Sequence, residues 1–270
     1  MINIQERLHK RGVSGSRYTR FLNQVSEFEK KLFAFFDASD FDRILDTLEL
    51  MVELHIDQAI RYDGTEYIEH PLAVAFRLLE AMLKFDAEAI IAALLHDTVE
   101  DQIDKLIKKV SEKYDSNAEK NASKNVYALD NEKAALALYY IEYHTQSVRV
   151  KNIISGLTNP NFDQILEKKG IGIEDATYRT ARNELYAEHV AHAIQDPDVG
   201  LVKIFDFEVN VQSIDTIPDK SKRVKFVRKY NPVVPVIIDR LRNEKNPLNI
   251  TTKKREELVH SFTIVFDKMI

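Results

Sequence analysis

The chain contains no cysteine. A disulfide scaffold, thiolate metal ligands and a thiol nucleophile are therefore all excluded. Glycine and proline are scarce, at seven each in 270 residues, and alternating apolar and polar runs are few, so the sequence predicts helices almost throughout. No apolar run approaches the roughly 18 residues of a membrane span, and the first residues form no apolar signal core. We expect an all-α, cytoplasmic protein with no membrane partner.

The charge balance is slightly acidic, with 38 Lys and Arg against 43 Asp and Glu and a net charge of −5. It provides no electrostatic attraction to nucleic acid, which we do not expect as a partner. The hydrophobic content of 44% is enough for a sizeable core. We expect an N-terminal helical extension over 1–40 and a main domain over 41–270. An insertion at about 105–175 contains a nearly low-complexity stretch at 111–125, which favours solvated decoration over a lid or a partner surface.

Local patterns predict several helices. Gly12 and Gly15 favour a mobile lead-in over residues 1–16, before an amphipathic stripe over 18–36. A second stripe over 41–56 follows a break at 37–39, with Asp40 as the expected N-cap. In a later helix, over 178–194, His189 and His192 lie one turn apart, but no matching ligand block accompanies them, so we interpret the pair as incidental.

The most informative stretch is 90–101, where an apolar run ends abruptly in ionisable side chains: His96, Asp97, Glu100 and Asp101. Residues 90–95 are apolar on every side, which predicts a helix buried all round. At 3.6 residues per turn, Asp97 lies over Asp101, while His96 and Asp97 are neighbours that can approach one ion. The pattern fits either a metal site or a buried histidine with a helix-end ion pair.

Two further blocks favour the metal site. His70 precedes Pro71 at the expected start of a helix, and Asp206 follows a second apolar run. Together with His96 and Asp97 they form a mixed nitrogen and oxygen set, suited to Mn, Fe, Zn or Mg. Glu100 and Asp101 are candidates to orient or deprotonate an attacking water. His55, three residues before Gln58, is expected to support the site and not to bind the metal.

These blocks resemble the metal-dependent HD-domain phosphohydrolases, and among them the RelA/SpoT-type alarmone hydrolases. The family pattern is Arg-x-x-Gly-x-x-Tyr-Ile-x-His-Pro, then Ala-Leu-Leu-His-Asp-x-x-Glu-Asp, then Lys-x-x-Asp-x-x-x-Asn; it matches closely over about 50–101 and more loosely over about 178–241. The resemblance implies an HD-domain helical bundle with extra helices and an inserted segment. It implies a divalent metal, manganese first, and hydrolysis of the 3′-pyrophosphate of (p)ppGpp with Glu100 and Asp101 activating water. The residues it places on the nucleotide side, with Arg61 packing on the guanine, are Arg61, Tyr62, Asp63, Asn210 and Ser213.

The departures from the family pattern lie around the nucleotide side. Tyr62 stands where the family has a basic residue, Glu66 where it has proline, and residues 207–209 replace Arg-Leu-His. Tyr62 could stack on a base in place of the lost cation, but Glu208 would repel phosphate if it faced the pocket. Two alternatives therefore stay open: an HD phosphohydrolase of another nucleotide, such as a mono- or triphosphate, and a non-catalytic nucleotide-sensing or partner-binding HD protein. The sequence leaves the oligomeric state open.

Overall fold

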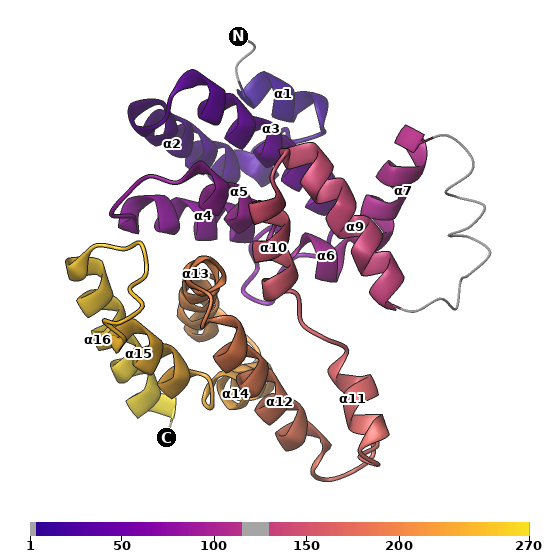
Figure 1. Ribbon diagram of the computed structural model, residues 1–270, viewed down its shortest axis with the longest axis vertical. Coiled ribbons are helices and arrows are strands. Elements are labelled where there is room, and N and C mark those ends of the chain that lie inside the picture. The colour runs from indigo at the N-terminus through magenta and orange to yellow at the C-terminus, as the bar shows by residue number, and fades with distance from the viewer. Residues whose placement is uncertain (1–3, 115–129, 270) are drawn as a thin grey trace. The chain divides into compact units, whose positions relative to one another are not determined.

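The computed structural model describes residues 4–114 and 130–269, and Figure 1 shows them as helices joined by loops. These residues contain no strand apart from an isolated bridge between Met82 and Ile250. The predicted all-α fold class is confirmed. Residues 115–125, the larger part of the predicted low-complexity stretch, lie outside the described residues. Within the described part of the chain, no helix is both long and apolar enough to cross a membrane.

The chain divides into two compact units. Unit 1 comprises Met1–Ile60, Glu66–Phe76 and Phe85–Thr158, and unit 2 comprises Arg61–Thr65, Arg77–Lys84 and Asn159–Ile270. The helices of unit 1 are α1 (Ile4–Lys10), η1 (Ser16–Tyr18), α2 (Thr19–Phe35), α3 (Ala38–His55), most of α4 (Glu69–Ala81), α5 (Ala87–Leu95), α6 (Thr98–Asp101), α7 (Ile103–Tyr114), α9 (Asp130–Thr145) and α10 (Val148–Leu157). The helices of unit 2 are the end of α4, α11 (Phe162–Lys168), α12 (Tyr178–Ala193), α13 (Pro197–Ser213), η2 (Ile214–Thr216), α14 (Lys220–Tyr230), α15 (Val234–Arg242) and α16 (Thr252–Met269).

The start of the chain differs from the prediction. Residues Ile4–Lys10 form a helix, because Ile4 and Leu8 are fully buried. Gly12 adopts a left-handed φ of 89°, so it ends this helix and does not prevent it. The predicted cap of α3 is also wrong: the helix begins at Ala38, and Asp37 is the N-cap, accepting a hydrogen bond from the backbone N–H of Asp40 at 3.0 Å.

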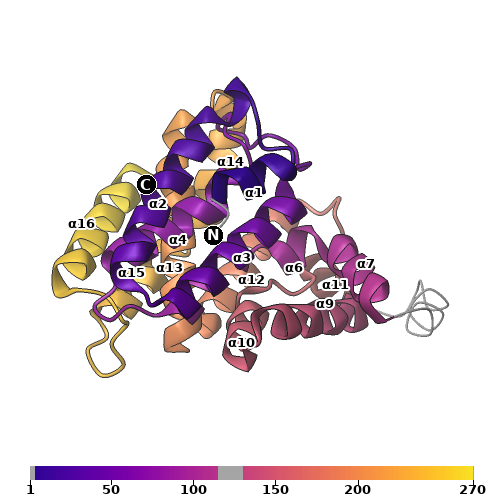
Figure 2. The same ribbon diagram turned by 90° about the horizontal axis from the view of Figure 1, so that it is seen from above.

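The described part of the predicted insertion up to residue 158 contributes to the core of unit 1. Helices α7 and α9 pack against each other, as Figures 1 and 2 both show, and they bury Leu106 and Ile141 completely. Helix α10 packs against α5. There Arg149 donates to Asp86 at 2.7 and 3.0 Å, and Asp86 also caps α5 by accepting from two backbone amides. These contacts hold the start of the helix that leads to His96.

Unit 2 centres on α13, most of whose residues are buried. Gly200 lies in its first turns, where an added Cβ would stand 2.8 Å from the carbonyl oxygen of Ile194. Only glycine permits that approach without a backbone shift. The same carbonyl accepts a hydrogen bond from Nε of buried Arg240 at 2.6 Å, so the loop before α13 is tied to α15.

Candidate metal centre

The centre begins where α5 ends. Residues 90–95 are fully buried, as the apolar run predicted, and the helix ends at Leu95 while α6 begins at Thr98. His96 and Asp97 form the turn between the two helices. The Thr98 hydroxyl donates to the carbonyl of Leu95 at 2.6 Å, which satisfies a backbone acceptor that the end of α5 leaves without a helical partner.

His70 lies in the first turn of α4, on a segment that two arginines from the N-terminal part of the chain hold in place. Arg17 donates to both oxygens of Glu66 at 2.6 and 2.7 Å. Arg20 pairs with Glu69 at 2.8 Å. Both glutamates are more than nine-tenths buried, so these contacts supply the partners that buried carboxylates need. The two pairs flank His70 in sequence and fix the start of its helix.

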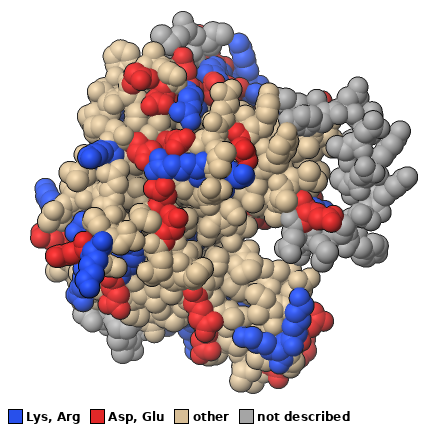
Figure 3. Space-filling model, viewed as in Figure 1, with Lys and Arg blue, Asp and Glu red and all other residues tan. Residues whose placement is uncertain are grey.

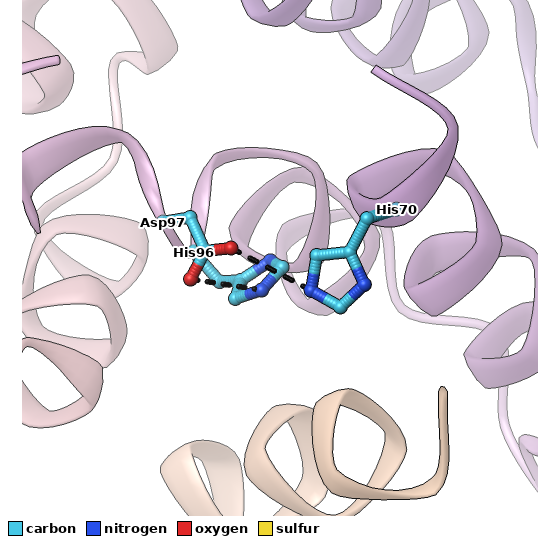
Figure 4. A group of neighbouring side chains, drawn as sticks. All are labelled: His70, His96 and Asp97. Carbon is cyan, nitrogen blue, oxygen red and sulfur yellow. Dashed lines mark ion pairs between the residues drawn. The ribbon is translucent and has the colours of Figure 1, made fainter. Parts of the chain in front are cut away.

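His70, His96 and Asp97 converge. One ligand atom of each lies within 4.8 Å of the other two, and Figure 4 shows both rings beside the carboxylate. Nε2 of His96 is 3.2 Å from Oδ1 of Asp97, and Nε2 of His70 is 3.5 Å from Oδ2. Both histidines are 3% exposed. Elsewhere in the described parts of the chain, no other such group of three occurs.

The donor set fits a divalent metal ion. Two donors that bind one ion at about 2.1 Å are at most about 4.2 Å apart, and the distances from Asp97 to His96 and His70, 3.2 and 3.5 Å, lie below that limit. Nδ1 of His96 lies 2.9 Å from the carbonyl oxygen of Ala93. A carbonyl only accepts, so Nδ1 carries the hydrogen, and in the neutral ring Nε2 then holds the lone pair that a metal requires. Imidazole nitrogens with a carboxylate suit Mn, Fe or Zn.

Tyr67 links the centre to Asp101. Its hydroxyl lies 2.8 Å from Oδ2 of Asp97 and within hydrogen-bond distance of Oδ2 of Asp101. Burial and the two nearby carboxylates raise the pKa of Tyr67 far above its ordinary value, so the hydroxyl keeps its single hydrogen and can donate it to one carboxylate at a time. Asp97 and Asp101 thus face the same way, as their spacing predicted. Glu100, on the same short helix, is exposed.

A second layer of side chains orients Asp101. Gln58 donates from Nε2 to Oδ2 of Asp101 at 3.0 Å, and its own Oε1 accepts from Gln102 at 2.7 Å and from Nδ1 of His55 at 2.6 Å. The His55 ring stacks on Tyr67, with centroids 5.0 Å apart and planes 10° apart. Burial lowers the pKa of His55, as expected for a packed, neutral histidine. The prediction that His55 is packed and hydrogen-bonded is confirmed, whereas the roles of Gln58 and Tyr67 were missed.

The remaining predicted residues belong to unit 2, where they form a network of their own. Oδ1 of Asp206 accepts from Asn210 at 2.6 Å, and Oδ2 lies 3.2 Å from the ammonium of Lys203. Arg61 donates to Oδ1 of Asn210 at 2.9 Å, and Ser213 donates to the Asn210 carbonyl at 2.8 Å. The structure therefore joins Arg61, Asn210 and Asp206 in one chain of hydrogen bonds.

Asp63 and Glu208, also in unit 2, have structural partners. Oδ1 of Asp63 accepts from the backbone and the hydroxyl of Thr65 at 3.0 and 2.7 Å, which closes the turn after Arg61. Glu208 is buried and pairs with Lys254 at 3.0 Å and with Arg77 at 3.6 Å. Its negative charge is compensated by these two cations.

Comparison with known proteins agrees with this geometry. Residues 47–123 match the family model of the HD domain, a segment that is less than a third of the chain and contains Tyr67, His70, His96, Asp97 and Asp101. No curated protein matches the chain significantly. The HD domain family consists in general of metal-dependent hydrolases, and the convergence of two histidines with an aspartate is consistent with that chemistry.

Proposed function

Because residues 47–123 match the HD domain, we propose that the chain is a metal-dependent nucleotide phosphohydrolase that removes the 3′-pyrophosphate of a guanosine alarmone. The observation that carries the reaction class is the convergence of His70, His96 and Asp97 within 4.8 Å. The motifs that resemble the RelA/SpoT-type hydrolases support the choice of substrate. Asp206 is proposed as the fourth ligand, with manganese as the first metal to test.

A bound divalent ion would polarise the phosphoryl group and lower the pKa of an attacking water. The protein's own part is to place a base beside that water, and Asp101 is suited to it. Tyr67 and Gln58 both contact Oδ2 of Asp101. Among the described residues no donor contacts its other oxygen, Oδ1, which is the atom we assign to accept the proton. Glu100 is proposed as the second member of this pair.

The reaction that these residues would perform is a simple hydrolysis. The oxygen of water forms a bond to phosphorus, and the bond from phosphorus to the 3′ oxygen breaks. One proton of the water passes to Asp101, and a proton from solvent returns to the released 3′ oxygen, so the products are pyrophosphate and a nucleotide with a free 3′ hydroxyl. No oxidant or further reactant is needed.

The network in unit 2 supports a role in nucleotide binding. Arg61 carries a planar guanidinium that can stack on a base, and its hydrogen bond to Asn210 orients that plane. Asn210 in turn donates to Asp206, so the proposed fourth ligand and the proposed base-binding arginine are held by the same amide. Ser213 fixes the backbone at Asn210.

The test is turnover by the purified chain, with Mn²⁺ and with chelator, against guanosine tetraphosphate, nucleoside mono- and triphosphates and cyclic nucleotides. We expect pyrophosphate from the tetraphosphate only, and none with chelator. Asp101→Asn should abolish turnover while the protein still binds Mn²⁺, and His96→Ala should lose the metal. Asp104→Asn, an exposed acid nearby in sequence that pairs with Lys133, is the matched control and should keep both.

Each outcome has a definite meaning. Phosphate release from a different nucleotide would keep the mechanism and replace the substrate. Full turnover by Asp101→Asn would show that the proton acceptor is assigned wrongly. A metal-loaded protein that turns over nothing in the panel would exclude the phosphohydrolase and favour a nucleotide-sensing role.

A further inference from the structure

Helix α14 carries an unusual concentration of positive charge. Its sequence, Lys-Ser-Lys-Arg-Val-Lys-Phe-Val-Arg-Lys-Tyr, has six cations and no acid, in a chain whose net charge is −5. On the face drawn in Figure 3, by contrast, basic and acidic side chains are interspersed. Residues 220, 222, 225 and 228 of α14 are exposed, and exposed like charges on one helix repel each other unless an anion binds there.

One of these cations is held in a defined position. The ammonium of Lys222 lies 4.6 Å from the centre of the Tyr62 ring, within the range of a cation–π contact. Phe226, one turn further along α14, contacts the same ring with centroids 5.4 Å apart. Tyr62 is 56% exposed, so the ammonium is held beside solvent. The contacts with Lys222 and Phe226 make Tyr62 an anchor for a cation.

The charge of Lys222 is not neutralised by an ion pair. Among the side chains that the structure describes, no carboxylate forms an ion pair with its ammonium. The nearest acid in sequence, Asp219, caps α14: it accepts hydrogen bonds from the hydroxyl and backbone of Ser221 and from the backbone of Lys222. The Ser221 hydroxyl and these amides lower the pKa of Asp219, and the charge of Lys222 still contributes to the lowered pKa, which keeps Asp219 ionised in this role. An ammonium carries three N–H donors, and the contact of Lys222 with the Tyr62 ring leaves them able to bond to an acceptor from solution.

Within unit 2, this cation stands next to the proposed nucleotide-binding residues. Tyr62 directly follows Arg61, and Arg61 donates to Asn210. A planar guanidinium suited to a base is thus carried by Arg61, and an ammonium suited to an oxyanion contacts the next residue, Tyr62. A nucleotide has both features, an aromatic base and phosphate groups.

We infer that Lys222, anchored on Tyr62, binds a phosphate group of the guanosine nucleotide. This assignment rests on the proposed function and deepens it, because it names a residue that binds the phosphate groups of the substrate. Lysine suits this role as a point charge with rotatable donors. The Tyr62 ring reduces the freedom that this long side chain would lose on binding.

The experiment is calorimetric titration of the full chain with guanosine, GMP and GDP in the presence of chelator, which prevents turnover. In the wild type, affinity should rise with each phosphate, and this gain should weaken with salt. Lys222→Ala should reduce the gain about three- to fivefold, the size expected of an exposed charge pair, and should leave guanosine binding unchanged. The matched control is Lys220→Ala, which removes the same charge from the same helix about 200° away around its axis and should keep the gain.

The role of Tyr62 is tested by a double-mutant cycle. Tyr62→Phe keeps the ring and should behave as wild type. Tyr62→Ala should reproduce Lys222→Ala, and the double variant should be no weaker than either single one. If Lys220→Ala and Lys222→Ala reduce the gain in affinity equally, the inference is wrong, and the general positive charge of α14 attracts the phosphate groups. No binding of any guanosine compound by the wild type would instead refute the guanosine substrate, while Mn²⁺ binding would still test the metal centre.

Discussion

Replacing Tyr67 by phenylalanine tests how the candidate metal centre is supported. The change removes one hydroxyl, which lies between Asp97 and Asp101, and keeps the ring that stacks on His55. A hydrogen bond to a charged group contributes about 1.5–3 kcal/mol, and the hydroxyl has only one hydrogen, so one such bond is lost. Loss of an outer-shell partner typically weakens metal binding about 10- to 100-fold. We therefore expect the dissociation constant for Mn²⁺ to rise by about tenfold or more.

Equilibrium unfolding with and without Mn²⁺ measures this change. A ligand present at 100 times its dissociation constant stabilises the folded state by about 2.7 kcal/mol, and a tenfold weaker site loses about 1.3 kcal/mol of that. The control is Tyr178→Phe, which removes a hydroxyl that donates to Asp163 at 2.6 Å in unit 2 and should leave the Mn²⁺ stabilisation intact. If Tyr67→Phe keeps the full Mn²⁺ stabilisation, Tyr67 does not hold Asp97 for the metal and our reading of the network is wrong.

Three further predictions concern stability and support. Asp86→Ala should lower the free energy of unfolding by about 1 kcal/mol for the lost cap. Burial opposes the charge of Asp86, but Arg149 and two amides outweigh it and lower its pKa, so the difference from wild type should be full above pH 3.8 and fade below it. Arg17→Ala should weaken Mn²⁺ binding in the same unfolding assay, because Glu66 loses its bidentate partner. Burial, with the charges of neighbouring groups, lowers the pKa of His189 from 6.5 to about 4, so His189→Gln should lose less stability than wild type between pH 6.5 and 4 in acid unfolding curves.

Local sequence patterns were sufficient to predict helices that are buried on one side or on every side. In the stripe predicted over 18–36, Phe21, Val25, Phe28 and Leu32 are fully buried in α2, whereas Phe33 is exposed. Local patterns did not predict elements whose formation depends on contacts between residues far apart in the sequence. Helix α1 is short and precedes two glycines, and it is held by its buried side chains and by pairs such as Arg7 with Glu49 at 2.6 Å. A contact over more than forty residues of sequence leaves no local signal.

Some residues of the candidate metal centre could likewise be predicted from local patterns, and others could not. His70 and His96 could be predicted together. His70 stands at the start of one apolar helix and His96 just after another, and a buried imidazole in either position needs a partner. Gln58 could not be predicted, since its amide reaches Asp101 only in the folded chain. The break between α5 and α6 was also invisible in the sequence, where residues 90–101 read as one helix. His96 and Asp97 approach the same point across that break, as their adjacent positions predicted.

The position of Glu208 on helix α13 bears on whether its charge would repel a phosphorylated substrate. Asp206, Asn210 and Ser213 recur at spacings of four and three and share one face, where Asn210 contacts Arg61. Glu208 is two residues from Asp206, about 200° around the helix, and there it meets Lys254 and Arg77. Its charge is therefore compensated and directed away from the residues proposed to bind the nucleotide. The acid that replaces a family residue at this position thus adds no repulsion on the face that carries Asn210.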